Sequence, residues 1–454
     1  MSFALRGSAS IVASLGTPAP SASSSSPASA RPRLIRNAPV FAAPATVVGM
    51  DAVERLKNGF AQFKAEVYDK KPELFEPLKA GQAPKYMVFA CADSRVCPSV
   101  TLGLQPGEAF TIRNIAAMVP AYDKTRYAGI GSAIEYAVCA LKVQVLVVIG
   151  HSKCGGIRAL NSLKDGTPDT FHFVEDWVRI GNPAKKKVQT ECASLSFDDQ
   201  CYALEKEAVN TSLENLKTYP FVKEGLANGT LKLVGGHYDF VSGKFDTWEP
   251  KTDMDAVGRL KSGFEQFKIT VYDKKPELFE PLKSGQTPRY MVFACADSRV
   301  CPSVTLRLQP GEAFTIRNIA AMVPAYDKNR YAGVGSAIEY AVCALKVEVI
   351  VVIGHSKCGG IKALLTLQDG APDTFHFVED WVRIGYVAKK KVQTICASLS
   401  VDDQCSALEK EAVNTSLENL KTYPFVKEGL ANGTLKLVGG HYDFVKGVFT
   451  TWQP

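Results

Sequence analysis

The chain has 454 residues, of which 46% are hydrophobic and 22% are charged, a composition typical of a globular protein with a large core. This excludes a collagen-like or wholly disordered protein. The net charge is +7, but four of these charges are arginines in the first fifty residues, so about +3 remains for the rest of the chain. Such a balance predicts no nucleic-acid binding. No membrane span is predicted either, because apolar runs such as 145–149 are far shorter than the roughly twenty residues a spanning helix needs.

Residues 1–49 form a leader rich in Ser, Ala and Pro, whose only charges are Arg6, Arg31, Arg33 and Arg36. A segment of this composition cannot bury enough apolar surface to fold alone. Ser- and Arg-rich, acid-poor segments are typical of organelle transit peptides, and an ordinary disordered tail is the alternative. The Ser/Pro-rich character favours a chloroplast over a mitochondrial address. We therefore expect the chloroplast stroma, or the cytosol if the leader is absent or unused.

An internal repeat determines the domain organisation. Residues 51–250 align with 255–454 without a gap, and about 27 of the 200 aligned positions differ. A unit of this length is far too long for a solenoid repeat, so we expect each copy to be a complete domain with its own core. The predicted organisation is a leader at 1–49, a first domain at 50–250, a linker at 251–253 and a second domain at 254–454.

Helices and strands are predicted to alternate along each copy. In the first copy, apolar residues at spacings of three and four from Val53 to Val67 predict an amphipathic helix. Short apolar runs predict strands buried on both faces at 86–90, 143–149 and 231–234. Further helices are predicted at 132–141 and 198–219. This alternation predicts an α/β fold, a central and mostly parallel sheet flanked by helices, in two tandem copies.

Metal-ligating residue types follow two of the predicted strands. Cys91 follows the first, and His151 and Cys154 follow the second. Because the carboxyl ends of parallel strands meet at one edge of a sheet, two thiolates and an imidazole can converge on one zinc ion with a fourth position open. Three protein ligands and an open position are typical of catalytic zinc. Cys97 is an alternative fourth ligand, although its sequence context favours a packed thiol.

Asp93 and Arg95 lie two residues apart, directly after the first proposed ligand. In an extended segment their side chains project the same way and can form a bidentate ion pair. Such a pair would keep Asp93 ionised and hold it off the metal. The alternative is a turn-capping aspartate with a surface arginine.

The pattern Cys91-x-Asp93-x-Arg95, followed by His151-x-x-Cys154, resembles the β-class carbonic anhydrases, and the surrounding sequence resembles their plant chloroplast members. The resemblance covers essentially all of each copy. It implies reversible hydration of carbon dioxide to bicarbonate and a proton by zinc-bound hydroxide, with one Zn²⁺ per copy. Since the second copy keeps every one of these residues, both copies are expected to be active.

The resemblance also implies a set of site residues. The zinc ligands would be Cys91, His151, Cys154, Cys295, His355 and Cys358. The catalytic pairs would be Asp93 with Arg95 and Asp297 with Arg299. The pocket for carbon dioxide and bicarbonate would be lined by Gln82, Phe110, Ile115, Tyr136 and Gly155 in the first copy and by Gln286, Phe314, Ile319, Tyr340 and Gly359 in the second.

The resemblance further implies that the domains pair, with some pocket residues supplied across the interface, and that pairs assemble into a higher homo-oligomer. Whether pairing occurs within or between chains is open. Three other functions are compatible with the residues: hydrolysis of carbonyl sulfide or carbon disulfide at the same zinc, direct attack by Cys91 or Cys154 on a substrate, and a non-enzymatic scaffold with two structural zinc sites. His172 and His237 are expected to be hydrogen-bonded structural histidines, with proton transfer as the alternative.

Overall fold

The computed structural model describes residues 50–164, 166–248, 254–370 and 372–454. The predicted leader and linker lie outside these residues. No helix in the described part of the chain is both long and apolar enough to cross a membrane.

Ten strands form one continuous sheet in the order β10-β9-β8-β6-β7-β2-β1-β3-β4-β5. The strands of the first copy are β1 (Tyr86–Cys91), β2 (Ala109–Asn114), β3 (Val145–His151), β4 (Lys232–Asp239) and β5 (Lys244–Trp248). Those of the second copy are β6 (Tyr290–Cys295), β7 (Ala313–Asn318), β8 (Val349–His355), β9 (Lys436–Asp443) and β10 (Val448–Trp452). Within each copy the first four strands pair in parallel and the last is antiparallel. The predicted α/β class with a mostly parallel sheet is confirmed.

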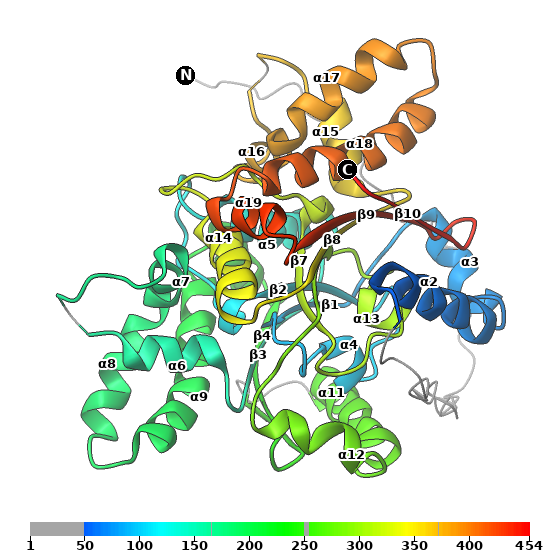
Figure 1. Ribbon diagram of the computed structural model, residues 1–454. Helices are drawn as coiled ribbons and strands as arrows, with labels where there is room; N and C mark the ends of the chain where they lie inside the picture. The colour runs from blue at the N-terminus through cyan, green and yellow to red at the C-terminus, as the bar shows by residue number, and fades with distance from the viewer. Residues whose placement is uncertain (1–49, 165, 249–253, 371) are drawn as a thin grey trace.

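Helices cover the sheet on both faces (Figure 1). The first copy contains α2 (Ala52–Phe63), α3 (Pro72–Ala80), α4 (Pro98–Thr101), α5 (Ala128–Glu135), α6 (Gly155–Ser162), α7 (His172–Val178), α8 (Asn182–Glu191), α9 (Phe197–Leu216) and α10 (Pro220–Ala227). The second contains α11 (Met254–Phe267), α12 (Pro276–Phe279), α13 (Pro302–Thr305), α14 (Ala332–Glu339), α15 (Gly359–Thr366), α16 (Val378–Val382), α17 (Tyr386–Ile395), α18 (Val401–Leu420) and α19 (Pro424–Ala431). Short π- or 3₁₀-helical turns occur at Lys64–Tyr68, Ile115–Ala117, Tyr136–Ala140, Arg179–Gly181, Lys268–Tyr272, Pro281–Lys283, Ile319–Ala321, Tyr340–Ala344 and Arg383–Gly385.

The two copies pair within one chain, and their sheets join where β2 runs antiparallel to β7. The contact between β2 and β7 is short, and Arg113 and Arg317 are the one pair of residues that lie opposite each other in its ladder. Backbone hydrogen bonds extend the contact, because Thr111 donates to the carbonyl of Ala296 and Thr315 donates to that of Ala92. Residues of both copies therefore meet along a local pseudo-twofold axis at the centre of the sheet.

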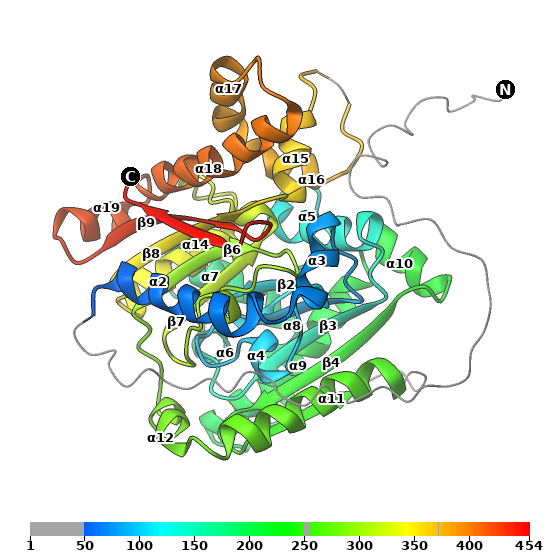
Figure 2. The same cartoon turned by 90° about the vertical axis from the view of Figure 1, so that its right-hand side faces the viewer.

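The first helix of each copy packs against the other copy. Figure 2 shows α2 beside the strands of the second copy and α11 beneath β4 of the first. Phe60 of α2 packs against Tyr442 and Phe449, with ring centroids 5.4 and 5.5 Å apart. Arg55 of α2 forms an ion pair with Glu312 at 2.8 Å. We expected each copy to have its own core, but the structure has a single apolar core that runs through both copies. The cores merge because each copy covers the other with its first helix.

Candidate metal centre

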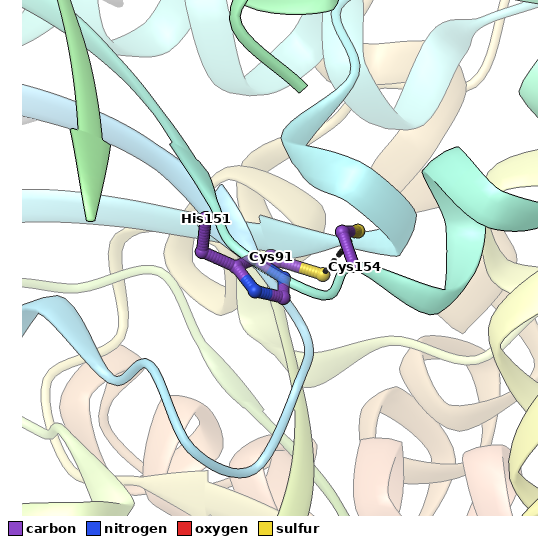
Figure 3. A group of neighbouring side chains, drawn as sticks. All are labelled: Cys91, His151 and Cys154. Carbon is purple, nitrogen blue, oxygen red and sulfur yellow. Dashed lines mark hydrogen bonds between the residues drawn. The ribbon is translucent and has the colours of Figure 1, made fainter. Parts of the chain in front are cut away.

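Three metal-ligating side chains of the first copy converge at the carboxyl edge of the sheet. Cys91 is the last residue of β1, His151 is the last residue of the adjacent β3, and Cys154 directly precedes α6. All three are buried, and their ligand atoms lie within 4.8 Å of one another. Figure 3 shows the three side chains close together. The two sulfur atoms lie 3.9 Å apart. This is the geometry that the strand-end argument predicted.

The imidazole of His151 is oriented to present one nitrogen to this group. Its Nδ1 lies 2.9 Å from the carbonyl oxygen of Ser152, and since a carbonyl only accepts, Nδ1 carries the proton. Its Nε2 is buried and has no hydrogen-bond partner among the described residues. A neutral imidazole with an unused Nε2 lone pair is the form that binds zinc. The donor set of two sulfurs and this nitrogen therefore fits zinc.

One thiol of the pair, that of Cys91, is placed in surroundings that favour a thiolate. Burial raises the pKa of Cys91, but its hydrogen bond with Cys154 and the neighbouring His151 outweigh burial and hold that pKa well below its ordinary value. The same hydrogen bond raises the pKa of Cys154 well above its ordinary value. The backbone N–H of Ala116 also donates to Cys91 Sγ at 3.3 Å, from a residue held in the left-handed region at φ 58°.

The second copy repeats the arrangement. Cys295, His355 and Cys358 are buried with their ligand atoms again within 4.8 Å of one another, and the two sulfurs are 4.0 Å apart. His355 Nδ1 lies 2.9 Å from the Ser356 carbonyl, and its Nε2 lacks a partner in the same way. Among the described residues, these two Cys-His-Cys groups are the clusters of side chains found close enough together to hold a metal ion. Cys97, the alternative fourth ligand, belongs to neither group.

Asp93 and Arg95 form the predicted bidentate ion pair. Arg95 Nε donates to Asp93 Oδ1 at 2.8 Å and its Nη2 donates to Oδ2 at 2.6 Å. Both side chains are buried, and the guanidinium stacks 4.5 Å from the ring centroid of Phe240. Burial raises the pKa of Asp93, but the hydrogen bonds and charge of Arg95 outweigh it, so the pKa lies below its ordinary value. The arginine thus favours the ionised carboxylate beside the candidate metal ligands.

Asp297 and Arg299 form the same bidentate pair in the second copy, at 2.8 and 2.6 Å. Burial again raises the pKa of Asp297, and Arg299 again lowers it by more. Asp297 Oδ2 lies 4.0 Å from His355 Nε2. The carboxylate therefore faces the position that a metal would take.

A glutamine from the opposite copy completes each site. Gln286 Nε2 donates to Asp93 Oδ2 at 2.8 Å, and its Oε1 accepts from the backbone N–H of Ser94 at 2.9 Å. Gln82 makes the same contacts with Asp297 and Ser298, at 2.8 and 2.9 Å. Gln82 therefore lies in the second site and Gln286 in the first, rather than each beside the metal group of its own copy.

The pocket tyrosines also cross between copies. A Cβ atom at Gly155 would lie 2.3 Å from the hydroxyl of Tyr340, and one at Gly359 would lie 2.3 Å from that of Tyr136, so both positions require glycine. Phe110 accompanies Tyr136, with ring centroids 5.8 Å apart, and Phe314 accompanies Tyr340 in the same way.

Ile115 stays with its own copy. A Cβ atom at Gly156, the second residue of α6, would lie 2.6 Å from the side chain of Ile115. Ile319 has the same relation to Gly360. The expected pocket sets are thus divided, with the glutamine, phenylalanine and tyrosine of one copy at the site of the other, because the copies are packed face to face.

A buried pair behind Cys154 is a feature that the sequence did not reveal. Glu205 Oε1 accepts from the backbone N–H of Cys154 at 3.3 Å, and its Oε2 lies 3.0 Å from His237 Nε2. The expectation that His237 is a hydrogen-bonded structural histidine is confirmed. Glu205 is one of several glutamates on the long helix α9, and its only distinguishing signal is its place on the apolar face of that helix.

Arg113 connects the ion pair to the interface between the copies. This buried side chain donates from Nε to the carbonyl of Cys91 at 2.9 Å and from Nη2 to that of Asp93 at 2.6 Å. Arg113 thereby fixes the backbone segment that carries the proposed metal ligand Cys91 and the carboxylate of Asp93. Arg317 does the same for Cys295 and Asp297.

Comparison with known proteins identifies the family. The family model described as carbonic anhydrase matches the chain twice, at residues 86–245 and 290–449. Beta carbonic anhydrase 3 of Arabidopsis thaliana is 53% identical over 201 residues, which are 44% of this chain and 78% of that protein. Among solved structures, the β-carbonic anhydrase CcaA is 31% identical with a TM-score of 0.40, covering 45% of this chain and 94% of its own. A tetrameric β-carbonic anhydrase of Sordaria macrospora is 27% identical with a TM-score of 0.39, covering 44% and 97%. The chain belongs to the β-carbonic anhydrase family of zinc-dependent lyases and carries the family's domain twice in tandem.

Proposed function

We propose that both copies catalyse the reversible hydration of carbon dioxide, at two sites that each draw residues from both copies. Membership of the family supports carbon dioxide hydration in general. The observation that carries the proposal for both copies is the symmetry of the two sites. Each combines a buried Cys-His-Cys group, an adjacent Asp-Arg ion pair and a glutamine from the opposite copy.

One zinc ion per copy would be held by Cys91, His151 and Cys154 in the first site. The corresponding ligands of the second site are Cys295, His355 and Cys358. Zinc in such a site, when bound, lowers the pKa of a water molecule toward neutrality and so supplies the hydroxide that attacks carbon dioxide.

Asp93 acts as the acceptor that orients the nucleophile. Arg95 occupies both carboxylate oxygens on one side, so the carboxylate is prevented from swinging into the ligand set. Both lone pairs of Oδ2 are engaged, one by Arg95 and one by Gln286, so a water molecule beside the metal would share the lone pair that the Gln286 amide uses. Since the carboxylate is held ionised, it performs this role at neutral pH and can pass the released proton outward. Asp297 has the same surroundings in the second site.

The glutamine and the apolar side chains bind substrate and product. Gln286 uses one N–H for Asp93, which leaves the second amide N–H for the bicarbonate anion in the first site. Ile115 and the crossing Phe314 supply an apolar wall suited to a linear, uncharged substrate. Tyr340, beside Gly155, closes the pocket from the opposite copy.

The remaining assignments rest on the sequence. We propose that residues 1–49 direct the protein to the chloroplast stroma, in keeping with their composition. The proposed domain limits are 50–250 and 254–454, which contain the two matches to the family model. We also propose that the paired copies assemble further into a homo-oligomer.

A stopped-flow carbon dioxide hydration assay tests the proposal for both copies. Cys154→Ser and Cys358→Ser each remove one ligand from one site, so each variant should retain about half of the activity of the intact chain. The double variant should fall to the uncatalysed rate. If one single variant keeps full activity while the other loses it all, only one copy is active and the proposal fails.

A further inference from the structure

Cys97 and Cys301 form a thiol pair at the interface between the two copies, outside both metal groups. Their sulfur atoms lie 3.8 Å apart, and both side chains are buried. Each cysteine directly precedes the equivalent short helix of its own copy, with nearly the same backbone angles, so the pair is symmetric about the pseudo-twofold axis. A disulfide needs the sulfurs at about 2.05 Å, so each must move by slightly less than ~1 Å.

The surroundings of this pair favour a reactive thiolate. The hydrogen bond from Cys301 lowers the pKa of Cys97 well below its ordinary value, against the effect of burial, and the charge of Arg113 acts in the same direction. The hydroxyl of Ser303 lowers it further. Thiolates beside positive charge and hydrogen-bond donors are those that oxidise readily. A narrow cavity lined by Ser99, Cys301 and Thr305 lies beside Cys301, and this is the side from which a small oxidant would approach the pair.

We propose that Cys97 and Cys301 are an oxidation site at which hydrogen peroxide forms a disulfide between the two copies. The Cys97 thiolate attacks one peroxide oxygen, which breaks the O–O bond, releases hydroxide and leaves a sulfenic acid. The Cys301 thiol then attacks that sulfur, which forms the S–S bond and releases water. The thiol protons neutralise the hydroxide, so two thiols and one peroxide give one disulfide and two waters. The two electrons pass from sulfur to oxygen.

The disulfide would close the chain between positions 204 residues apart. It would join the two halves that must stay together for either composite site to exist, since Gln82 and Gln286 each serve the opposite copy. A disulfide between Cys97 and Cys301 would therefore hold the residues of both pockets together at once.

Peptide mapping of the full, zinc-loaded chain tests the proposal. The protein is treated with hydrogen peroxide, its remaining thiols are alkylated, and it is digested without reduction for mass spectrometry. We expect a cross-linked peptide containing Cys97 and Cys301, two hydrogen masses below the sum of its parts, while the zinc content stays constant. On a non-reducing denaturing gel, the oxidised chain should run faster than the reduced one, and dithiothreitol should reverse the shift.

Two variants sharpen the result. Cys97→Ser should reduce the fast-running form at least tenfold, whereas Cys139→Ser, which changes a partly exposed thiol outside the pair, should leave it unchanged. The wild-type map needs no variant to fold, so the proposal stays testable if Cys97→Ser is unstable. Alkylation of both Cys97 and Cys301 after treatment, or a disulfide between ligand cysteines with loss of zinc, would overturn it.

Discussion

Gln82 of the first copy donates a hydrogen bond to the carboxylate of Asp297 in the second, with Nε2 and Oδ2 2.8 Å apart. Its symmetry mate, Gln286, makes the same contact with Asp93. Neither site is therefore contained in its own copy. A chain cut between the copies would have to reassemble before either pocket could form, and a substitution in one copy acts on the chemistry of the other.

This crossing predicts the effect of Gln82→Ala. In a Cys154→Ser background only the second site works, and Gln82→Ala removes the hydrogen bonds that this site receives at Asp297 and Ser298. A hydrogen bond to a charged group is worth about 1.5–3 kcal/mol, so the hydration rate should fall about 10- to 100-fold. Stopped-flow measurement of carbon dioxide hydration gives the result.

The matched control is Gln286→Ala in the same background. Gln286 serves the first site, which Cys154→Ser has already disabled, so this variant should leave the residual rate unchanged. Equal losses from both substitutions, or a loss from Gln286→Ala alone, would contradict the crossed assignment.

Asp93→Asn combined with Asp297→Asn should abolish most of the activity. Asparagine keeps the shape but loses the negative charge, so it is a poorer acceptor beside the nucleophile and no longer pairs with the buried guanidinium. Loss of a positioned acid–base group typically costs a factor of about 10² to 10⁴ in rate. The exposed Asp198→Asn serves as the control, and zinc content should remain at the wild-type value. Full activity in the double variant would favour a purely structural role for these aspartates.

Much of the fold could be predicted because its core elements are apolar runs. The strands expected at 86–90 and 143–149 are found as β1 and β3, displaced at most two residues. The strand β2 was missed because its sequence includes Arg113 and Asn114, although every residue is buried. The guanidinium of Arg113 donates to the carbonyls of Cys91, at the end of β1, and of Asp93, just after it, and this compensation depends on tertiary structure.

The site could be predicted only as far as one copy determines it. Strand ends place Cys91, His151 and Cys154 together, and a two-residue spacing allows the ion pair of Asp93. The position of Gln82 could not be found in this way, because it depends on how the copies exchange their first helices. Spacing within one copy contains no information about a contact more than 200 residues away.

Removal of zinc should abolish activity without unfolding the protein. The ligands lie at the ends of strands whose own apolar residues are fully buried, so the sheet does not depend on the metal for its core. Dialysis against a chelator should lower the hydration rate to background, while far-ultraviolet circular dichroism stays near the wild-type spectrum. Zinc should restore the rate, with about two ions bound per chain. Loss of the helical signal on chelation would instead indicate structural zinc sites.

Glu135 caps a helix of the opposite copy, so its removal should destabilise the whole chain. The buried carboxylate of Glu135 accepts hydrogen bonds from the backbone N–H groups of residues 376–378, at 2.7, 2.9 and 3.1 Å. Glu135→Ala leaves these donors without their acceptor, which should lower the free energy of unfolding by about 2 kcal/mol or more. Urea denaturation followed by circular dichroism should show a lower midpoint. The exposed Glu54→Ala should shift it by less than about 0.5 kcal/mol. Equal midpoints for the two variants would show that this contact between copies contributes little to stability.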